Sequence, residues 1–438
     1  TGVQTCALPI YALFAQPDQR KGRQVLARKE LITALDIGSS RICCFVAEID
    51  ETDRVSVTGI GHHASQGIKA GTIVNMEDAQ HSVISAVYAA EQMAGEQIRD
   101  VFVNISCGHP ESGQLVLETS IDGSAIGDSE MRRLLNENRL RDTGNDRALV
   151  HAIPAGYKID GSNGIRDPRG LSGQTLGVQI RTVSVSASAI QNLNTCIGRC
   201  HLNVRGHVVS AYASGLSCLV EDETDLGVTV IDMGGGTTTM AVFFDGSVIY
   251  TDCVPVGGAH ITSDIARGLA TPVSEAERLK TLYGSAIPSS LDEREMIDVP
   301  LVGEQDENHP NHVPKSLLIR IIHPRLEETF ELVRNRLEAS GFDKVAGRRV
   351  VITGGASQMP GIRDLAQEIL DKQVRLGRPI RVNGLADVAS GPAFATSAGL
   401  LAYAADPALD ASRQGHVANK ETGGGLFGRV GSWLRENF

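Results

Sequence analysis

Leu-Asp-Ile-Gly-Ser-Ser-Arg-Ile at residues 35–42 and Asp-Met-Gly-Gly-Gly-Thr-Thr-Thr at residues 232–239 are two forms of one pattern. In each, an apolar run leads into an aspartate, then into a turn of glycine and hydroxyl residues, and then into a second apolar run. This pattern predicts a strand, a tight turn and another strand. Asp36 and Asp232 lie 196 residues apart (232 − 36), the spacing expected of two similar half-molecules. We therefore expect an α/β fold built from two duplicated halves.

Turns of glycine and hydroxyl residues are suited to binding phosphate. Their backbone N–H groups can approach an anion without a Cβ in the way. Two such turns that face each other would clamp a nucleotide polyphosphate, and Asp36 and Asp232 would then place two carboxylates where a hydrated Mg²⁺ binds. A single turn of this kind is common in loops that bind nothing. The prediction therefore rests on both turns, together with a third Gly-Gly turn at residues 350–357 that leads toward a helical stretch.

Other nucleotide and metal motifs give weaker signals. The sequence has no Gly-Lys dipeptide, which excludes a P-loop. Residues 59–64, Gly-Ile-Gly-His-His-Ala, formally match a dinucleotide-binding fingerprint, but Ser-Gln-Gly follows where a helix should run, so we interpret the segment as a turn. Cys196, Cys200 and His201 have the spacing of zinc ligands on a helix, but no second ligand pair accompanies them, and core cysteines are the favoured interpretation.

The composition indicates a large globular protein and excludes a general nucleic-acid binder. The 438 residues carry 41 Lys and Arg against 52 Asp and Glu, a net charge of −11, whereas nucleic acid requires a dominant basic face. A chain of this length predicts two to four domain-sized units. Its eight cysteines form no disulfide framework, and no apolar run reaches the roughly 18–20 residues of a membrane span. We expect a cytoplasmic protein with reduced thiols.

Residues 111–190 interrupt the first half of the molecule. A half-domain without an insertion would not need these 80 residues between the two aspartate turns. The segment contains a polar helical stretch at residues 128–141. It also contains three strand-like stretches, at residues 115–121, 148–159 and 177–185. It predicts an inserted α+β subdomain.

Residues 255–345 follow the second aspartate turn as a further unit. They include a loop-like stretch at residues 284–314 and a helix predicted to begin at Pro324, after which apolar residues recur every three to four positions.

At the N-terminal end of the chain, residues 1–28 match none of the patterns found in the rest of the sequence. We expect these first residues to be a cloning or gene-assembly remnant.

The C-terminal residues predict a linker and an amphipathic helix. Residues 406–425 are polar and Gly-rich without periodicity. In residues 426–438, at 100° per residue, the apolar side chains fall within about 140° of arc and the charged ones fall opposite. The apolar set is Leu426, Phe427, Val430, Trp433, Leu434 and Phe438. The helix could dock on its own domain or lie on a membrane, and the long linker and the interfacial position of its tryptophan favour lipid.

These features resemble the actin, Hsp70 and sugar-kinase superfamily and, within it, the FtsA family of bacterial cell-division proteins. The resemblance extends from about Leu31 to Phe438. The run from His151 to Gly173 inside the predicted insertion is specific to that family, and so is the C-terminal tail. The resemblance implies an actin-like ATPase fold of two duplicated halves, in which the inserted α+β subdomain replaces the usual small subdomain of actin, followed by a C-terminal amphipathic helix.

The resemblance also implies subdomain boundaries. Subdomain 1A would comprise residues 29–110, 191–225 and 385–405, and would carry subdomain 1C, residues 111–190. Subdomain 2A would comprise residues 226–254 and 346–384, and would carry subdomain 2B, residues 255–345. Residues 406–425 would be a flexible linker before the membrane-targeting helix at residues 426–438.

ATP and Mg²⁺ are the cofactors that the resemblance implies. Asp36 and Asp232 look like the catalytic carboxylates, which coordinate Mg²⁺ through water next to the phosphates. The implied nucleotide-binding residues come from three turns and one helix: Gly38, Ser39, Ser40 and Arg41; Gly234, Gly235, Gly236, Thr237 and Thr238; Gly354, Gly355 and Ala356; and Glu277 and Lys280 at the ribose and adenine. Without the resemblance, the last two would be an ordinary surface ion pair.

The resemblance implies a protein that polymerises and tethers FtsZ filaments to the cytoplasmic face of the inner membrane at the division septum. Residues 255–345 would contact FtsZ, residues 111–190 would contact other division proteins and neighbouring protomers, and the tail would bind lipid. Residues 208–215 align with a connecting helix of the superfamily and contain no Gln, Glu or Asp to activate water, so we expect at most a slow ATPase whose nucleotide acts as an assembly switch.

Two alternatives share the predicted fold. A small-molecule kinase of the same superfamily would need a substrate pocket and a catalytic Asp, and would have no use for a lipid-binding tail. A scaffold protein of type IV pilus assembly would lack the family run at residues 151–173.

Overall fold

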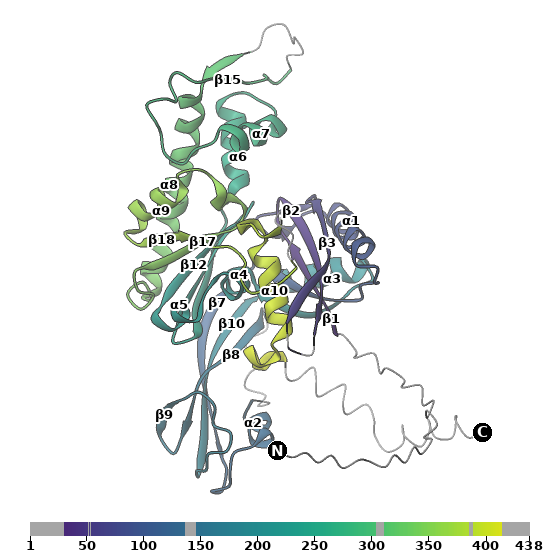
Figure 1. Ribbon diagram of the computed structural model, residues 1–438, viewed down its shortest axis with the longest axis vertical. Helices are drawn as coiled ribbons and strands as arrows, with labels where there is room; N and C mark the ends of the chain where they lie inside the picture. Colours follow the sequence, from purple (N-terminus) through teal and green to yellow (C-terminus); the bar gives the residue numbers. More distant parts are fainter. Residues whose placement is uncertain are drawn as a thin grey trace, which may run out of the picture.

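The computed structural model describes residues 30–413 except residues 51, 53, 136–145, 304–310 and 385–388. The predicted N-terminal extension, the amphipathic helix and the linker beyond residue 413 lie outside the described residues. Figure 1 shows two halves side by side with helix α10 between them, a third sheet that projects below, and a helical unit that projects above the second half.

The two halves each contain a five-stranded sheet with the same strand order. The first sheet has the order β3 (Val55–Ala64), β2 (Arg41–Ile49), β1 (Glu30–Ile37), β6 (Asp100–Ile105) and β11 (Asn203–Val209). The second has the order β14 (Ser247–Val254), β13 (Thr238–Phe244), β12 (Val228–Met233), β17 (Arg349–Thr353) and β18 (Gln373–Leu376). In both sheets the first three strands are antiparallel neighbours, and the last two are added in parallel. The matching order confirms the predicted α/β fold of two duplicated halves.

The two aspartate turns are hairpins of the same construction. In each, strand pairing stops one residue after the aspartate and leaves a four-residue turn. The first turn is closed by the N–H of Gly38, which donates to the carbonyl of Arg41 at 3.0 Å, and the second by the N–H of Gly234, which donates to the carbonyl of Thr237 at 2.9 Å. Both hairpins lie at the centre of their sheets, so the turns are held by strands on either side.

Helix α1 (Met76–Ala94) packs on the first sheet against β2 and β3. The predicted turn at residues 59–64 is wrong, because these residues belong to β3. Their glycines permit close packing with the helix: a Cβ at Gly61 would lie 2.0 Å from the carbonyl oxygen of Ala86. Glycine at this position therefore marks the approach of another backbone rather than a reversal of the chain.

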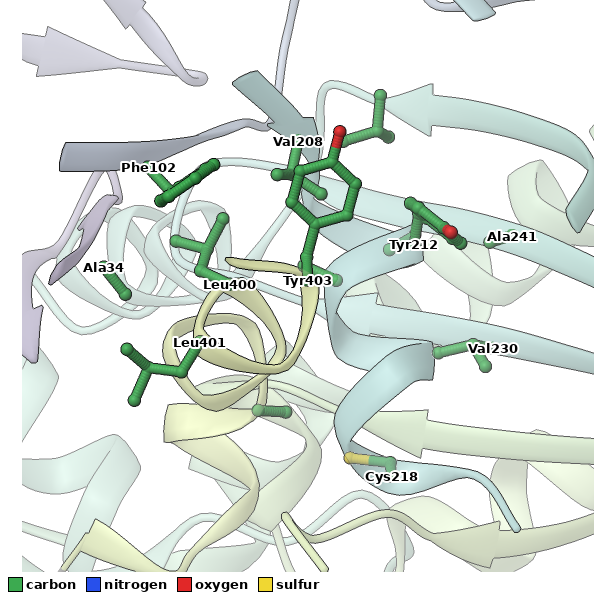
Figure 2. Packing of buried hydrophobic residues seen from close by; sticks show 14 of the residues in the cluster. Ala34, Phe102, Val208, Tyr212, Cys218, Val230, Ala241, Leu400, Leu401 and Tyr403 are labelled. Carbon is green, nitrogen blue, oxygen red and sulfur yellow. The ribbon is translucent and has the colours of Figure 1, made fainter. Parts of the chain in front are cut away.

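Two helices cross between the halves, each after the last strand of a sheet. Helix α4 (Ser210–Cys218) follows β11, and α10 (Ala395–Ala405) comes after β18. A Cβ at Gly399 of α10 would lie 1.7 Å from the carbonyl oxygen of Ala213 on α4, so only glycine permits this contact. Figure 2 shows the buried cluster to which both helices and both sheets contribute, including Phe102, Tyr212, Val230, Leu400 and Tyr403. A single core therefore joins the halves.

A separate four-stranded antiparallel sheet is inserted between β6 and helix α3 (Ala187–Arg199). Its strand order is β7 (Glu111–Ser120), β10 (Thr175–Ser186), β8 (Arg147–Ile159) and β9 (Ser162–Ile165), and helix α2 (Asp128–Leu135) packs against it. The three strands expected in this segment are present, and β9 is a strand that the sequence did not predict. The sheet has a hydrophobic core of its own, which includes Leu117, Leu134 and Leu176.

The helical unit after the second hairpin contains α6 (Gly258–Gly268), α7 (Val273–Tyr283) and α8 (Lys315–Ser340), with a small ribbon of β15 (Met296–Asp298) and β16 (His312–Pro314). The predicted start of the long helix at Pro324 is wrong, because α8 begins at Lys315 and continues through the proline. Leu318 and Ile322 extend the buried stripe of α8 toward its N-terminus, and this packing outweighs the missing N–H of the proline.

The remaining elements are short. They are β4 (Ile68–Lys69), β5 (Thr72–Ile73), α5 (Glu221–Leu226), α9 (Ile362–Leu370) and 3-10 turns at Gly355–Gln358, Pro392–Phe394, Pro407–Leu409 and Ala411–Arg413. Helix α9 is the helical stretch expected after the third glycine turn. Among the helices that the structure describes, none combines the length and the apolar character needed to cross a bilayer.

A buried carboxylate fixes the point at which the chain leaves α10. Asp410 accepts hydrogen bonds from Nδ1 of His151 at 2.7 Å and from the hydroxyl of Tyr403 at 2.9 Å. Nε2 of His151 accepts the N–H of Val209 at 3.0 Å, so Nδ1 carries the proton. Burial opposes the charge on Asp410, but the hydrogen bonds from His151 and from the N–H of Ala152 outweigh it and lower the pKa of the carboxyl. This network joins the inserted sheet, α10 and the start of α4.

Replacing Asp410 with alanine should lower the free energy of unfolding by about 2–5 kcal/mol, because the buried donors of His151 and Tyr403 would lose their acceptor. Asp222 has an exposed side chain on α5, and its replacement with alanine should change stability by less than about 1 kcal/mol. Urea denaturation followed by circular dichroism measures both. Equal stability of the two variants would contradict a structural role for the network.

Candidate functional site

The tips of the two hairpins touch. A Cβ at Gly235 would lie 1.9 Å from Oγ of Ser40, and a Cβ at Gly236 would lie 2.4 Å from Oγ of Ser39. Any larger residue at these two positions would collide with the serine side chains of the other hairpin, so both positions require glycine. The two turns lie almost 200 residues apart in the sequence. The structure brings the two predicted turns together, and both aspartates line the cavity beside them.

A cavity of about 510 Å³ opens beside the hairpin tips. Its volume is within the usual range of small-molecule sites, about 300–1,000 Å³. Its walls contain every predicted nucleotide-site residue except Thr238: Asp36, Gly38, Ser39, Ser40, Arg41, Asp232, Gly234, Gly235, Gly236, Thr237, Glu277, Lys280, Gly354, Gly355 and Ala356. The predicted membrane-binding residues, 426–438, lie outside the described residues.

Thr238 points away from this cavity. Its hydroxyl donates to the carbonyl oxygen of Val256 at 2.8 Å, and its side chain is fully buried. Successive side chains of a strand point to opposite faces. The neighbours Thr237 and Thr239 therefore face the cavity, and both line it.

The two aspartates are held by hydroxyl groups from the crossing helices. Oγ of Ser397 donates to Asp36 at 3.0 Å, while Oγ1 of Thr396 and Oγ of Ser214 each donate to Asp232 at 2.7 Å. Thr396 and Ser397 are consecutive residues in the first turn of α10, so that turn binds one aspartate of each half. The N-terminus of a helix favours negative charge, which makes this a suitable place for two carboxylates.

Burial raises the pKa values of both acids. Burial, followed by the charge of Asp232, raises the pKa of Asp36 to about 7, against hydrogen bonding from Ser397 and the charge of Arg41. Burial also raises the pKa of Asp232, against the hydrogen bonds from Ser214 and Thr396. Within the described ranges, neither carboxylate forms a salt bridge with a basic side chain. An added cation would therefore relieve the repulsion between them.

The donor set fits Mg²⁺ held through water. Mg²⁺ prefers oxygen ligands, keeps several of its waters and is usually bound by one or two carboxylates together with substrate phosphates. Asp36 and Asp232 supply two carboxylates at the cavity wall, and no cluster of three or more His, Cys, Asp or Glu that could hold a metal occurs in the described part of the chain. The site therefore fits a hydrated cation that phosphate helps to bind.

Glu277 and Lys280 also line the cavity. Their side chains form an ion pair at 2.6 Å across one turn of α7. Nζ of Lys280 also donates to Oγ1 of Thr262 at 2.9 Å and to the carbonyl of Gly258 at 3.2 Å, so the lysine is anchored to α6. These additional bonds and the cavity position distinguish the pair from an ordinary surface ion pair.

The third glycine turn lies against the second aspartate. Gly354 has a left-handed φ of 87°, and a Cβ there would lie 2.4 Å from Oδ1 of Asp232. Glycine is therefore required by both backbone conformation and space.

Arg41, at the end of the first turn, donates to the carbonyl of Ala393 at 2.9 Å, and its guanidinium carbon lies 4.2 Å from the ring centroid of Phe394. These contacts connect the first hairpin to the loop before α10.

Several cavity residues were not predicted from the sequence. Asn104 is the penultimate residue of β6, and its Oδ1 accepts the N–H of Ile37 at 2.6 Å while its Nδ2 donates to Ser210 at 3.2 Å. Its position near the carboxyl end of a buried strand of parallel type was a usable signal, because the carboxyl ends of such strands meet at one edge. Thr239 and Thr396 also line the cavity. Cys196 is buried in the core of the first half, as favoured above over a zinc ligand.

Replacing Asp36 with asparagine should stabilise the protein at neutral pH in the absence of metal and nucleotide. Because folding raises the pKa of Asp36 to about 7, the folded chain holds the proton more tightly than the unfolded chain, and ionisation costs stability as the pH rises. The gain should begin near pH 4, level off above about pH 7 and be on the order of 1–4 kcal/mol. Thermal unfolding from pH 4 to 8 measures it. A gain that does not vary with pH would contradict this assignment.

Comparisons with known proteins match both the halves and the insertion. The family model described as "Cell division protein FtsA" matches residues 229–399, and the model "SHS2 domain inserted in FTSA" matches residues 107–184. Among solved structures, the PilM-PilN type IV pilus biogenesis complex has a TM-score of 0.58 at 15% identity and covers 86% of this chain and 99% of its own. MreB5 of Spiroplasma citri bound to AMPPNP has a TM-score of 0.50 at 13% identity, with 90% and 99% covered. These neighbours confirm the predicted actin-like fold.

Curated relatives are similar over almost the entire chain. "Cell division protein FtsA" of Agrobacterium fabrum is 42% identical over 423 residues, 94% of this chain and 96% of the relative. The protein of the same name from Pseudomonas aeruginosa is 34% identical over 413 residues, and that from Escherichia coli K12 is 30% identical over 417. Identity at this level over this length favours the FtsA resemblance over the kinase and pilus-scaffold alternatives. The chain belongs to the FtsA family of cell division proteins.

Proposed function

We propose that this chain is an ATP-binding, actin-like cell-division protein that polymerises and tethers FtsZ filaments to the cytoplasmic membrane. Membership of the FtsA family supplies the role in division. The observation that carries the nucleotide part of the proposal is the contact between the two hairpins beside one cavity, with Asp36 and Asp232 at its wall.

The cavity supports binding of ATP with Mg²⁺. The turns at residues 38–41 and 234–237 line the cavity and would bind the polyphosphate, and the turn at 354–356 with Glu277 and Lys280 would receive the ribose and adenine. Asp36 and Asp232 would hold Mg²⁺ through its water shell, and the bound cation would neutralise phosphate charge. The neighbour MreB5 of Spiroplasma citri, bound to AMPPNP, shares the fold.

The same residues predict slow hydrolysis. A general base must reach the attacking water and accept its proton. Helix α4 contributes Ser210 and Ser214 to this region, and neither hydroxyl is a general base at neutral pH. Asp36 and Asp232 are assigned to the cation in this proposal. ATP would therefore act as an assembly switch rather than as a rapidly consumed substrate, with turnover far below the typical enzyme value of about 10 per second.

The C-terminal segment supports membrane binding. The network around Asp410 anchors the chain where the polar linker begins, so the predicted helix at residues 426–438 would be attached to a fixed point on the body. One short amphipathic helix binds lipid weakly and reversibly, and a filament that presents many tails would bind through avidity. The protein would then lie peripherally on the cytoplasmic face of the inner membrane at the septum.

The two smaller units would provide the protein contacts. The helical unit within residues 255–345 would bind FtsZ, and the inserted sheet within residues 111–190 would contact neighbouring protomers and other division proteins. Both units project from the body of the molecule in Figure 1, so each offers surface that the nucleotide cavity does not use. No nucleic acid is expected as a partner, since the net charge is −11.

Co-sedimentation tests the combined proposal. The full chain should pellet with liposomes that contain anionic lipid, it should carry FtsZ into the pellet, and Mg²⁺-ATP should increase both amounts, because filament formation adds avidity. Each component is also centrifuged alone as a control. Failure of FtsZ to pellet with membrane-bound protein would contradict the tethering role, while a lack of response to ATP would contradict the assembly switch.

Replacing Trp433 with glutamate should reduce liposome binding by at least tenfold, because a charge would replace the large interfacial anchor of the apolar face. Replacing Ser432 with glutamate adds the same charge to the polar face of the predicted helix and is the matched control, expected to retain most binding. Equal effects of the two variants would indicate that net charge rather than an amphipathic face controls membrane binding.

A further inference from the structure

Thr239 is the one cavity-lining residue in the described part of the chain with a buried, unpaired polar side-chain atom. Its side chain is 3% exposed, and its Oγ1 has no hydrogen-bond partner. The other unpaired buried atoms of the described residues belong to Ser65, Arg181 and Ser247, and none of these residues lines the cavity. A buried hydroxyl without a partner destabilises the fold, so its retention at a cavity wall indicates a partner that binds from outside the chain.

The strand register places this hydroxyl beside an aspartate. Thr239 on β13 is the direct cross-strand partner of Asp232 on β12. Side chains of directly opposed residues lie on the same face of an antiparallel pair, about 4.5–5.5 Å apart at Cβ. Both therefore face the cavity, and both are among its lining residues.

The hydroxyl groups that contact the two aspartates are already engaged. Ser214 and Thr396 donate to Asp232, and Ser397 donates to Asp36. Thr238, the adjacent residue, donates to a backbone carbonyl on the other face of its strand. Thr239 is thus left with a donor and an acceptor available at the polyphosphate end of the cavity.

The duplicated hairpin of the first half carries no such group. There the cross-strand partner of Asp36 is Cys43, which is buried and does not line the cavity. Burial, followed by the charge of Asp36, raises the pKa of the Cys43 thiol to about 12, so it stays uncharged at neutral pH. Only the second hairpin has a hydroxyl at this position. The first hairpin forms the same turn without one, so the turn itself does not require the Thr239 hydroxyl.

We infer that the Thr239 hydroxyl is a ligand-binding group that hydrogen-bonds the oxygen shell of the Mg²⁺-polyphosphate, next to Asp232. The inference rests on the proposed binding of ATP and adds a residue to it. Phosphate oxygens and metal-bound water present the same hydrogen-bonding chemistry to a hydroxyl, which can donate to the first and accept from the second.

Binding and stability measured on the full chain test this inference. Replacing Thr239 with valine keeps the shape and removes the hydroxyl. We expect the dissociation constant for Mg²⁺-ATP to rise about tenfold, because the loss of one hydrogen bond to a charged group weakens binding by about that factor. The affinity for adenosine should stay unchanged, because adenosine lacks phosphate. Replacement with serine should keep the affinity within about twofold of wild type. Without ligand, the valine variant should unfold at the same temperature as wild type or higher.

Ser247 provides a matched control. It is another buried, unpaired hydroxyl in the second sheet, but it lies outside the cavity lining. Its replacement with alanine should leave the affinities for both ligands unchanged. Titrations of ATP in the presence of EDTA distinguish phosphate oxygen from metal-bound water. If the Thr239→Val variant binds ATP more weakly than wild type even without Mg²⁺, the hydroxyl bonds to phosphate. If its affinity is lower only with Mg²⁺, the hydroxyl bonds to metal-bound water.

Two results would overturn the inference. Wild-type affinity of the valine variant for Mg²⁺-ATP would show that the hydroxyl does not contact the ligand, and an equal loss for adenosine and ATP would show a distorted cavity instead. If the wild-type chain bound no ATP, the proposed nucleotide binding itself would be wrong, and this inference would be withdrawn with it.

Discussion

The contact between the two hairpin tips constrains the rest of the molecule. Ser39 and Ser40 occupy the space that a Cβ at Gly235 or Gly236 would need, so the two turns can meet only because one of them is all glycine at the tip. Each hairpin continues into the central strands of its own sheet. The contact therefore sets the two halves against each other and brings their aspartates to one cavity, which neither half could form alone.

Helix α10 connects this cavity with the C-terminal part of the chain. Thr396 and Ser397 in its first turn hold the two aspartates, and Tyr403 near its other end holds Asp410, where the polar linker begins. One helix of 11 residues thus carries side chains to both places. A rigid element that contacts two sites is the physical requirement for coupling between them, and α10 meets that requirement.

Features encoded in a short contiguous stretch could be predicted from the sequence, and features set by register or by distant packing could not. Both hairpins and their aspartates were recognised from single runs of eight residues. Thr396 and Ser397 were not recognised, because their partners lie 164 and 361 residues away. The cavity-facing position of Thr239 depends on which strand face is buried. The predictions at residues 59–64 and at Pro324 were wrong, because helix packing outweighed the local turn and helix-breaking tendencies.

The proposed function requires both hairpins to bind the same triphosphate. A crystal structure of the full chain grown with Mg²⁺ and a non-hydrolysable ATP analogue tests it most directly. We expect the phosphates to contact backbone N–H groups of residues 38–41 and 234–237 together, with the cation's water shell against Asp36 and Asp232. A ligand bound by only one hairpin, or bound elsewhere on the chain, would contradict it.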